Sequence, residues 1–435
     1  MDKIKIIDSM PSTGKTCYII EYIKELPDTQ KVVYITPLLS ETERIKKGCK
    51  GKRFCTPNVK LGKGSKHRNF KDLVIKGKNI ATTHSLFKLL DEEAFKLIKE
   101  QNYILIMDEV VEVVQIIDLY TDYDEYSEDE RQRICKNDIH TLIDKNLISI
   151  DSEYKLSWVD AEKSLNRYSQ LKEIIELKEI YFSANTVLIE LFPHRVFTEN
   201  IFKEIIVMTY QLEYQLLSYY FEFFAIQYEK FGIIKHRVNG RTKYIYSLVN
   251  YDEYLKFDLE MRKKLKTKIH IVESENKNEI GKKDIGSRKE KLSVRYYKEI
   301  EESDIKKIKR KTNSFISEKL SNCTTKLMWT VFKNHIDDIK TTRMNENSFV
   351  PINARATNEY RDKIALIYLV NRFIHPYIEH LFSAKSISFD RDAYALSEMI
   401  QWIWRSAIRD NKPIDIYIPS ERMRNLLIAW LNGEF

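Results

Sequence analysis

Short apolar runs alternate along the chain with segments whose apolar residues recur at helical spacing. Residues 3–8 form a run of strand type, and residues 17–26 place their isoleucines and leucine at helical intervals. Residues 31–37 and 38–47 repeat this order of strand and helix. The pattern predicts two successive strand–helix units at the start of the chain.

Further strand-like runs follow along the rest of the sequence. Strands that alternate with helices are typical of an α/β fold in which crossovers connect parallel strands. The pair Asn239-Gly240 also predicts a β-hairpin over residues 235–249. The other predicted strands begin or lie within residues 79–90, 103–114, 179–186, 204–211, 326–333, 363–373 and 414–420.

The chain has 435 residues, of which 43% are hydrophobic and 31% charged. This composition is that of a globular protein. The length suggests two or three domains of roughly 150 residues each. No apolar run reaches the ~20 residues of a membrane helix, and the start is too short and charged for a signal peptide. Five scattered cysteines without a C-x-x-C pair argue against a disulfide framework or a zinc ribbon. We expect a cytoplasmic protein with no membrane partner.

Positive charge is concentrated in two stretches of the chain, whose net charge is +8. Residues 44–78 contain thirteen basic residues, one acid and five of the eleven glycines. A flexible cationic stretch suits a phosphate-rich polymer, because neutralised phosphates release their counterions. Composition alone equally fits a solvated loop, and the acidic residues 118–130 argue against one uniform basic surface. The second surplus lies in residues 261–310, for which we expect a partly disordered insertion.

A phosphate-binding pattern lies between the first predicted strand and the first predicted helix. Residues 9–16, SMPSTGKT, match G-x-x-x-x-G-K-[ST] at its last three positions, with Ser9 in place of the first glycine. The chemistry needs Gly14 for a tight turn, Lys15 for the β- and γ-phosphates and Thr16 for Mg²⁺. The pattern predicts ATP–Mg²⁺ binding by Pro11, Ser12, Thr13, Gly14, Lys15 and Thr16.

An acidic pair follows a later apolar strand. Residues 103–109, YILIMDE, end in Asp108 and Glu109. An acid at this point holds magnesium through water, and the next acid orients the attacking water. Together with the phosphate-binding loop, the pair predicts a nucleotide-hydrolysis site in which Lys15, Asp108 and Glu109 are catalytic and Thr16 and Asp108 hold the metal.

These motifs resemble those of superfamily 2 helicase-type P-loop ATPases, which include the DEAD- and DEAH-box proteins, in a divergent form found in phages and mobile elements. Residues 9–16 resemble motif I, and residues 107–110 (MDEV) resemble motif II. Val110 and Val111 stand where the family has alanine followed by histidine or aspartate. The resemblance spans most of the chain and implies two RecA-like α/β lobes with ATP and Mg²⁺ between them.

The resemblance also implies a division of the chain. The first RecA-like lobe would cover residues 1–200, with motifs I to III. Residues 201–255 would begin the second lobe and include the hairpin. Residues 256–312 would form the basic insertion, and residues 313–435 the remainder of the second lobe, with motifs IV to VI.

Several residues resemble family motifs that contact the backbone of a nucleic acid. Thr36-Pro37 resembles motif Ia, and Thr82 to Ser85 resembles the next such motif, through Thr83 and His84. The expected partner is a nucleic acid, with single-stranded DNA favoured and RNA as the alternative, together with replication or recombination proteins. We also expect five residues of the basic stretch to contact the nucleic acid: Lys52, Arg53, Lys63, Lys66 and Arg68.

The remaining motifs are spread over the second half of the chain. Residues 183–186 (SANT) resemble motif III, which in the family couples hydrolysis to strand movement. Residues 326–330 fit motif IV, and residues 353–360 lie where motif V is expected. Residues 401–409, QWIWRSAIR, are similar to motif VI, Gln-x-x-Gly-Arg-x-x-Arg, with Trp404 in place of glycine.

Arg405 and Arg409 are four residues apart and would share one face of a helix. The resemblance implies that they face the nucleotide, as Gln401 would, and stabilise charge on the γ-phosphate. Loss of such an arginine typically costs about 10³ or more in rate. The alternative is a solvated basic helix face, since Arg422 and Arg424 lie nearby.

The sequence favours an ATP-dependent helicase or translocase, but two other functions fit it. One is an ATP-switched nucleic-acid-binding accessory protein without unwinding activity, which the departures at Ser9, Val110 and Trp404 favour. The other is a P-loop kinase of a small molecule, which the chain length and the distant arginines disfavour. Dehydrogenase and metal-hydrolase chemistry lack their motifs, because the sequence has no G-x-G-x-x-G and no H-E-x-x-H.

Overall fold

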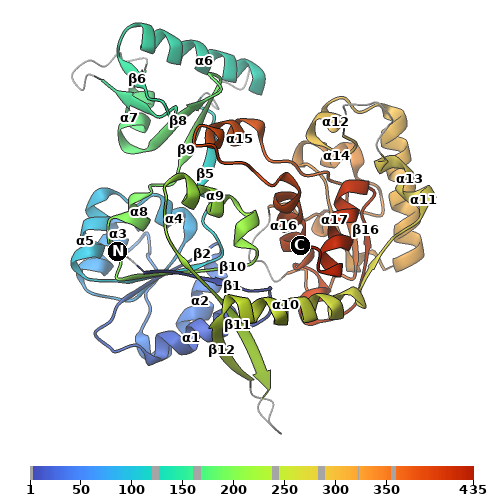
Figure 1. Cartoon of the computed structure of the whole chain (residues 1–435), viewed down its shortest axis with the longest axis horizontal. Helices are drawn as coiled ribbons and strands as arrows, with labels where there is room; N and C mark the ends of the chain where they lie inside the picture. Colours follow the sequence, from blue (N-terminus) through green and yellow to red (C-terminus); the bar gives the residue numbers. More distant parts are fainter. Residues whose placement is uncertain are drawn as a thin grey trace.

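The computed structural model consists of two α/β lobes, which the helix α10 (Tyr251–Lys266) connects, and a smaller unit beside the first lobe (Figure 1). The structure describes residues 3–119, 127–159, 168–237, 244–282, 290–321, 323–353 and 359–435. The predicted turn at Asn239-Gly240 and most of the expected motif V, residues 353–360, lie outside the described residues.

A seven-stranded sheet forms the centre of the first lobe, in the order β12-β11-β1-β10-β4-β2-β3. All neighbouring strands are parallel except β11 and β12, which form an antiparallel pair. Strands covered on both faces read as continuous apolar runs, as in β2 and β4. The strands are β1 (Lys3–Asp8), β2 (Val32–Thr36), β3 (Ile80–Thr83), β4 (Ile104–Asp108), β10 (Glu204–Thr209), β11 (Glu229–Arg237) and β12 (Tyr244–Asn250).

Helices cover both faces of this sheet and create two hydrophobic layers. On one face, Ile19, Ile23 and Ile45 of the helices pack against Tyr34 and Ile106 of the strands. The helices of this face are α1 (Lys15–Glu25) and α2 (Leu39–Gly48). The other face is covered by α3 (Lys66–Ile75), α4 (His84–Lys88), α5 (Glu92–Glu100), α8 (Arg195–Thr198) and α9 (Leu216–Phe223).

The smaller unit is inserted between β4 and β10 and lies at the top of Figure 1. Its three-stranded sheet has the order β5-β9-β8, and β6 pairs with β7 beside it. A separate apolar cluster, including Ile139, Leu171 and Phe182, holds it together. Its elements are β5 (Val114–Ile117), α6 (Glu128–Asp144), β6 (Ile148–Ile150), β7 (Leu156–Trp158), α7 (Ser169–Leu177), β8 (Glu179–Ser183) and β9 (Val187–Leu191).

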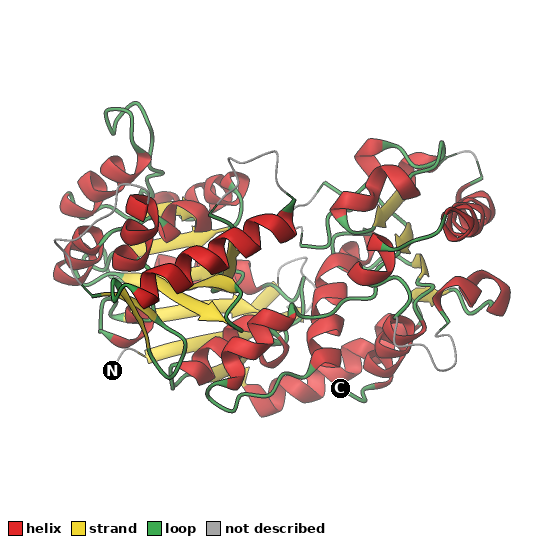
Figure 2. Ribbon diagram, turned by 90° about the horizontal axis from the view of Figure 1, so that it is seen from above, coloured by secondary structure: helices red, strands yellow, loops and turns green. Residues whose placement is uncertain are grey.

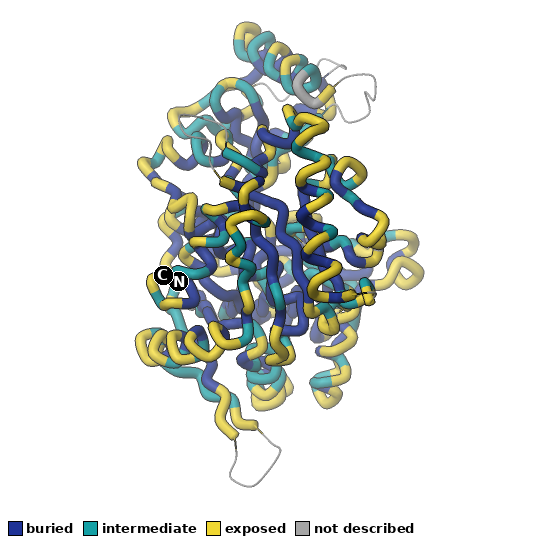
Figure 3. Tube along the Cα trace, turned by 90° about the vertical axis from the view of Figure 1, so that its right-hand side faces the viewer, coloured by how far each residue is buried: buried dark blue, intermediate teal, exposed yellow. Residues whose placement is uncertain are grey.

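The second lobe is built on a four-stranded parallel sheet in the order β13-β16-β15-β14. Figure 2 separates this smaller sheet from the larger sheet of the first lobe, and Figure 3 shows its buried strands between helices with exposed outer faces. Its strands are β13 (Ile269–Ile271), β14 (Leu327–Thr330), β15 (Ala365–Tyr368) and β16 (Ile414–Tyr417). The helices after α10 are α11 (Glu275–Asn278), α12 (Val294–Lys298), α13 (Glu302–Leu320), α14 (Ile336–Ile339), α15 (Pro376–Ser383), α16 (Arg391–Ile403) and α17 (Glu421–Asn432).

The α/β class with parallel sheets is confirmed, but the strands divide the chain differently from the expected ranges. Residues 201–255, expected to begin the second lobe, contribute β10, β11 and β12 to the first sheet. Their place follows from register, because β10 pairs in parallel with both β1 and β4. The strand expected at 326–330 is present as β14.

Residues 256–312, expected as a flexible basic insertion, contribute regular elements to the second lobe. Strand β13 pairs with β16 at the edge of the second sheet. Helix α13 buries Ile308, Phe315 and Ile316 in the core of this lobe. Lys306, Lys307, Arg310 and Lys319 lie on the outer face of this amphipathic helix, whereas Lys311 is buried. The apolar face fixes the position of the helix. Residues 283–289 of this range lie outside the described part.

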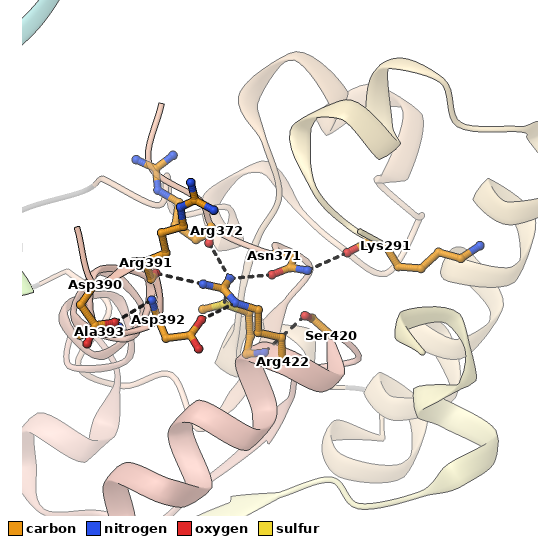
Figure 4. Close-up of polar contacts among 10 residues, drawn as sticks. Lys291, Asn371, Arg372, Asp390, Arg391, Asp392, Ala393, Ser420 and Arg422 are labelled. Atoms are coloured by element: carbon orange, nitrogen blue, oxygen red, sulfur yellow. Dashed lines mark hydrogen bonds and ion pairs between the residues drawn. The ribbon is translucent and has the colours of Figure 1, made fainter. Parts of the chain in front are cut away.

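Arg422 connects three segments of the second lobe (Figure 4). Its Nε donates to Asp392 Oδ1 at 2.7 Å, and a terminal nitrogen donates to Asn371 Oδ1 at 3.0 Å. The same guanidinium donates to the carbonyls of Arg372 and Arg391 at 2.8 and 2.9 Å. This arginine, which lies near the expected motif VI, therefore has a structural role: it holds α17 against the start of α16.

Candidate functional site

The candidate residues of the first lobe gather at the carboxyl edge of its sheet. Asp8, the last residue of β1, is in register with Thr209, and Met208 is in register with Asp108. On the far side of β4, the ends of β2 and β3 meet in the pair formed by Thr36 and Thr83. Ligands of parallel α/β sheets bind at this edge.

The expected phosphate-binding loop connects β1 to α1. Gly14 has φ 103°, and Ser12 has φ 70°, so the loop turns through two left-handed positions. The Thr13 amide and hydroxyl both donate to the Met10 carbonyl, at 3.3 and 2.8 Å. Helix α1 has no side-chain cap, so the N–H groups of its first turn face the loop without a capping oxygen. This arrangement fits a bound phosphate.

Ser9, which replaces the first glycine of the pattern, has a structural role. Its hydroxyl is buried and accepts a hydrogen bond from the Ile233 amide of β11 at 2.7 Å. On the other side of the loop, the ring of Tyr246 in β12 lies so close to Gly14 that an added Cβ would be 2.1 Å from it. Gly14 is therefore needed for both its backbone conformation and its close contact with β12.

Lys15 points back into the loop, where its Nζ donates to the carbonyls of Ser9 and Met10. Burial lowers the pKa of Lys15, and the carboxylates of Glu109, Asp8 and Asp108 oppose that shift. The ammonium group is therefore close to both predicted acids. A cation held over a phosphate-binding loop in this way attracts the phosphates of a nucleotide.

Asp108 ends β4, and its Oδ2 accepts a hydrogen bond from the hydroxyl of Tyr34 at 2.8 Å. The pKa of Asp108 is raised to about 6, first by burial and then by the charge of Glu109, while the hydrogen bond from Tyr34 opposes the rise. Glu109 has φ 66°, and its amide donates to the Met208 carbonyl at 3.1 Å. The strand thus ends in a strained residue at the site, a feature associated with function.

Val110 and Val111, which depart from motif II, are buried in the core of the first lobe. Val111 packs where the family pattern has histidine or aspartate, and Val110 packs where it has alanine. The departure from the family pattern is therefore a packing feature of this chain.

Arg409 approaches the first lobe from the second. Burial lowers the pKa of Arg409, and the negative charge of Glu109 opposes the shift. Arg409 in turn acts on the pKa of Lys15, so its charge lies within electrostatic reach of the phosphate-binding loop. The structure therefore brings together Lys15, Asp108, Glu109 and Arg409, although at least 300 positions separate each of the first three from Arg409 in sequence.

The prediction that Arg405 and Arg409 share one face of a helix is wrong. Helix α16 ends at Ile403, and Arg409 lies in a separate 3-10 turn, Ala407–Asp410. The physical reason is Ser406, whose extended backbone breaks the helix and whose hydroxyl caps the turn. Arg405 is only 4% exposed within the second lobe. Gln401, near the end of α16, is half-buried.

Several residues of the site carry no motif in the sequence. Tyr34 contacts Asp108 directly, and Glu41, buried at the start of α2, acts electrostatically on both Asp108 and Arg409. The carboxylate of Asp8 accepts the amides of Gln211 and Leu212 at 2.7 and 3.0 Å and so ties the end of β10 to the loop. An apolar strand that ends in a polar residue was a sequence signal for Asp8 alone.

The residues expected at the nucleic-acid backbone lie at the same sheet edge. Thr36 is fully buried, and its hydroxyl has no hydrogen-bond partner within the described residues. The Thr83 hydroxyl accepts the Leu86 amide at 3.3 Å and caps α4, which begins at His84. Pro37 and His84 are half-buried.

The basic candidates separate into two groups. Lys52 pairs with Asp28 at 2.8 Å and also donates to the Leu26 carbonyl, so it joins segments of the first lobe. Its neighbour Arg53 is exposed at the end of a 3-10 turn. The others, Lys63, Lys66 and Arg68, are exposed at or before the start of α3.

The SANT residues lie outside the two main sheets. Ser183 ends β8 in the smaller unit, and its hydroxyl donates to the Tyr377 carbonyl of α15 at 2.7 Å. The Ala184 amide donates to His380 Nδ1 at 3.2 Å. The stretch therefore joins the smaller unit to α15. Strand β8, which precedes these residues, is not part of the first sheet, where the neighbours of β4 are β10 and β2.

The fold defines a two-lobed α/β protein, whose loop between β1 and α1 matches the phosphate-binding pattern at its last three positions. A family model described as the YonV C-terminal Rossmann-like domain matches residues 263–431. The chain is 33% identical to the SPbeta prophage-derived uncharacterized protein YonV of Bacillus subtilis (strain 168), and the match covers 100% of both chains. The chain therefore belongs to the YonV family. A prophage relative agrees with the phage origin that the resemblance implied.

Two solved structures are similar to the chain at 12% sequence identity. One is XPD in its apo form, with a TM-score of 0.43 over 96% of this chain and 92% of that one. The other is Xpd4 of S. tokodaii, with a TM-score of 0.41 over 98% and 94%. Within the described residues, no helix is long and apolar enough to cross a membrane.

Proposed function

We propose that the protein is an ATP-dependent nucleic-acid motor of the helicase or translocase type. The observation that carries the proposal is the position of Arg409, a residue of the second lobe within electrostatic reach of Lys15 and Glu109 in the first. An ATPase with such a divided site responds to nucleotide by changing how its lobes meet.

The residues of the site divide the reaction among them. The first-turn amides of α1 and Lys15 bind the β- and γ-phosphates, and Thr16 and Asp108 hold Mg²⁺. Mg²⁺ held by these residues would supply charge neutralisation at the phosphate oxygens. Glu109 orients the attacking water, and Arg409 stabilises charge that develops on the γ-phosphate.

The nucleic acid binds at the carboxyl edge of the first sheet. The adjacent ends of β2 and β3 contact its backbone through Pro37, Thr83 and His84, because Thr36 itself is fully buried. The exposed cations Lys63, Lys66 and Arg68 add affinity through counterion release. Single-stranded DNA is the preferred track, in prophage replication or recombination, and RNA is the alternative.

The test is ATP hydrolysis by the purified protein without polymer and with single-stranded DNA, single-stranded RNA or duplex. We expect severalfold stimulation by one polymer and loss of turnover in Lys15→Ala. Lys24→Ala is the matched control, because Lys24 is an exposed lysine of the same helix. Hydrolysis indifferent to every polymer would refute the motor. If one polymer stimulates hydrolysis, a tailed-duplex assay separates unwinding from translocation.

A further inference from the structure

The phosphate-binding loop is attached to the second lobe at Met10. The Met10 side chain is buried in the hydrophobic cluster of the second lobe, together with Trp402, Met423 and Trp430. Its amide donates to the hydroxyl of Tyr254 in α10 at 2.6 Å. Met10 thus belongs to the loop by sequence and to the second lobe by packing.

The Met10 peptide also faces the nucleotide side of the loop. Its carbonyl accepts the Thr13 hydroxyl at 2.8 Å and the Lys15 ammonium at 3.4 Å. The Met10 amide and the Ser9 carbonyl belong to one peptide group, and the Ser9 carbonyl also accepts the Lys15 ammonium. A shift of this Ser9–Met10 peptide therefore moves an oxygen that holds Lys15. The Ser9–Met10 peptide therefore links Tyr254 of α10 to the Lys15 ammonium.

Three side chains on one face of α10 form a buried column behind Met10. Tyr254, Asp258 and Arg262 are spaced by four residues, which places them above one another on the helix. They are 1%, 1% and 6% exposed. Gly232 of β11 leaves room for the Tyr254 ring, because a Cβ at that position would lie 2.1 Å from it.

Hydrogen bonds run the length of this column. Tyr254 donates to Asp258 Oδ1 at 3.2 Å, and Arg262 Nε donates to Asp258 Oδ2 at 2.6 Å. Arg262 also donates to the Phe435 carbonyl at 2.6 Å, and its guanidinium lies 5.2 Å from the centre of the Trp430 ring. The far end of the column is therefore held by the last helix of the second lobe and the residues after it.

We propose that Tyr254 is a positioning residue of the nucleotide site: Asp258 and Arg262 of the same helix orient its hydroxyl, and the Tyr254 hydroxyl holds the Lys15 ammonium in place through the Ser9–Met10 peptide. Asp258 fixes the Tyr254 hydroxyl as a donor on its own side, so that the oxygen lone pair faces the Met10 amide. Nucleotide at the loop and packing of the second lobe thereby act on the same peptide. This inference rests on the proposed ATP site.

The first test measures amide hydrogen exchange of Met10 without nucleotide. Tyr254→Phe keeps the ring but leaves the buried amide without its acceptor, so we expect exchange at least about tenfold faster than in the wild type. Tyr220→Phe is the matched control, because Tyr220 is also buried and its hydroxyl donates to the Phe192 carbonyl at 2.7 Å. Equal Met10 exchange in the two variants would overturn the proposal.

A second variant tests the distant end of the column. Removing one charge of a buried pair is strongly destabilising, whereas replacing both is tolerated more often. The double change Asp258→Leu plus Arg262→Met therefore removes the ion pair without touching the loop. We expect it to accelerate Met10 exchange as well; unchanged exchange in the folded double variant would limit Tyr254 to a local contact and contradict the inference.

ATP binding distinguishes failure of this inference from failure of the proposed function. If the wild type binds Mg-ATP, Tyr254→Phe is expected to weaken binding about tenfold, an effect of one lost buried hydrogen bond, with a smaller change in kcat. Faster Met10 exchange without weaker ATP binding in Tyr254→Phe would contradict the link to Lys15. A wild type that binds no ATP refutes the proposed function, while the exchange experiment still decides the role of the column.

Discussion

The hydrogen bond from Tyr34 to Asp108 allows a quantitative test of the candidate site. Tyr34 is fully buried, and its hydroxyl lies 2.8 Å from Asp108 Oδ2. Tyr34→Phe removes only the hydroxyl. When Asp108 is ionised, the lost bond to a charged acceptor is worth about 1.5–3 kcal/mol, whereas a neutral bond is worth about 1 kcal/mol. The free energy of unfolding should therefore fall more above the pKa of Asp108 than below it.

The direction of the pKa change gives the sign of this effect. Burial raises the pKa of Asp108 to about 6, and the Tyr34 hydroxyl opposes this shift. Removing the hydroxyl raises the pKa further. A difference of about 1 kcal/mol between the two pH ranges corresponds to somewhat less than one pKa unit.

The assay is urea-induced unfolding of the metal-free protein at pH 5 and pH 7.5. Tyr103→Phe is the matched control, because its buried hydroxyl donates to the uncharged Lys78 carbonyl at 2.8 Å. We expect a loss that grows with pH for Tyr34→Phe and a constant loss for Tyr103→Phe. An equal loss at both pH values for Tyr34→Phe would refute the assignment of Asp108 as a buried, partly protonated acid.

Three further outcomes follow from the site. Lys15→Ala should abolish nucleic-acid-stimulated hydrolysis but leave low-salt binding of single-stranded DNA largely intact, as measured by fluorescence anisotropy. Arg409→Ala should lower kcat by about 10³ with little change in nucleotide affinity, measured in single-turnover reactions; a normal kcat would remove Arg409 from the site. The raised pKa of Asp108 means that the metal-free fold loses stability as pH rises through about 6. Asp108→Asn should abolish this loss, which is at most about 3 kcal/mol, in the same unfolding assay.

Much of the first lobe could be predicted from local sequence. The run at residues 3–8, the loop SMPSTGKT and the helical spacing after it predict strand, loop and helix, as found in β1 and α1. The strand that ends in Asp108 can also be predicted from local sequence, because four apolar residues in succession suit a strand covered on both faces. These features depend on neighbouring residues and on backbone chemistry.

The C-terminal part shows where local reasoning fails. The spacing of Arg405 and Arg409 predicts one helix face, but Ser406 ends the helix and caps a new turn between them. The basic composition of residues 256–312 predicts an insertion, but its apolar minority includes the edge strand β13 and the buried face of α13. Composition averages over a segment, whereas packing depends on a few positions within it.

The sequence by itself determined the chemistry available in this protein: a phosphate-binding loop, an acidic strand end and distant arginines. Only the tertiary structure decided which of these residues meet, because parallel register places β10 between β1 and β4 and brings Asp8, Thr209 and Asp108 to one edge. It also placed Arg409 near Lys15 and Tyr254 behind Met10. Such contacts join residues hundreds of positions apart, and their energy comes from burial and hydrogen bonding that no local pattern encodes.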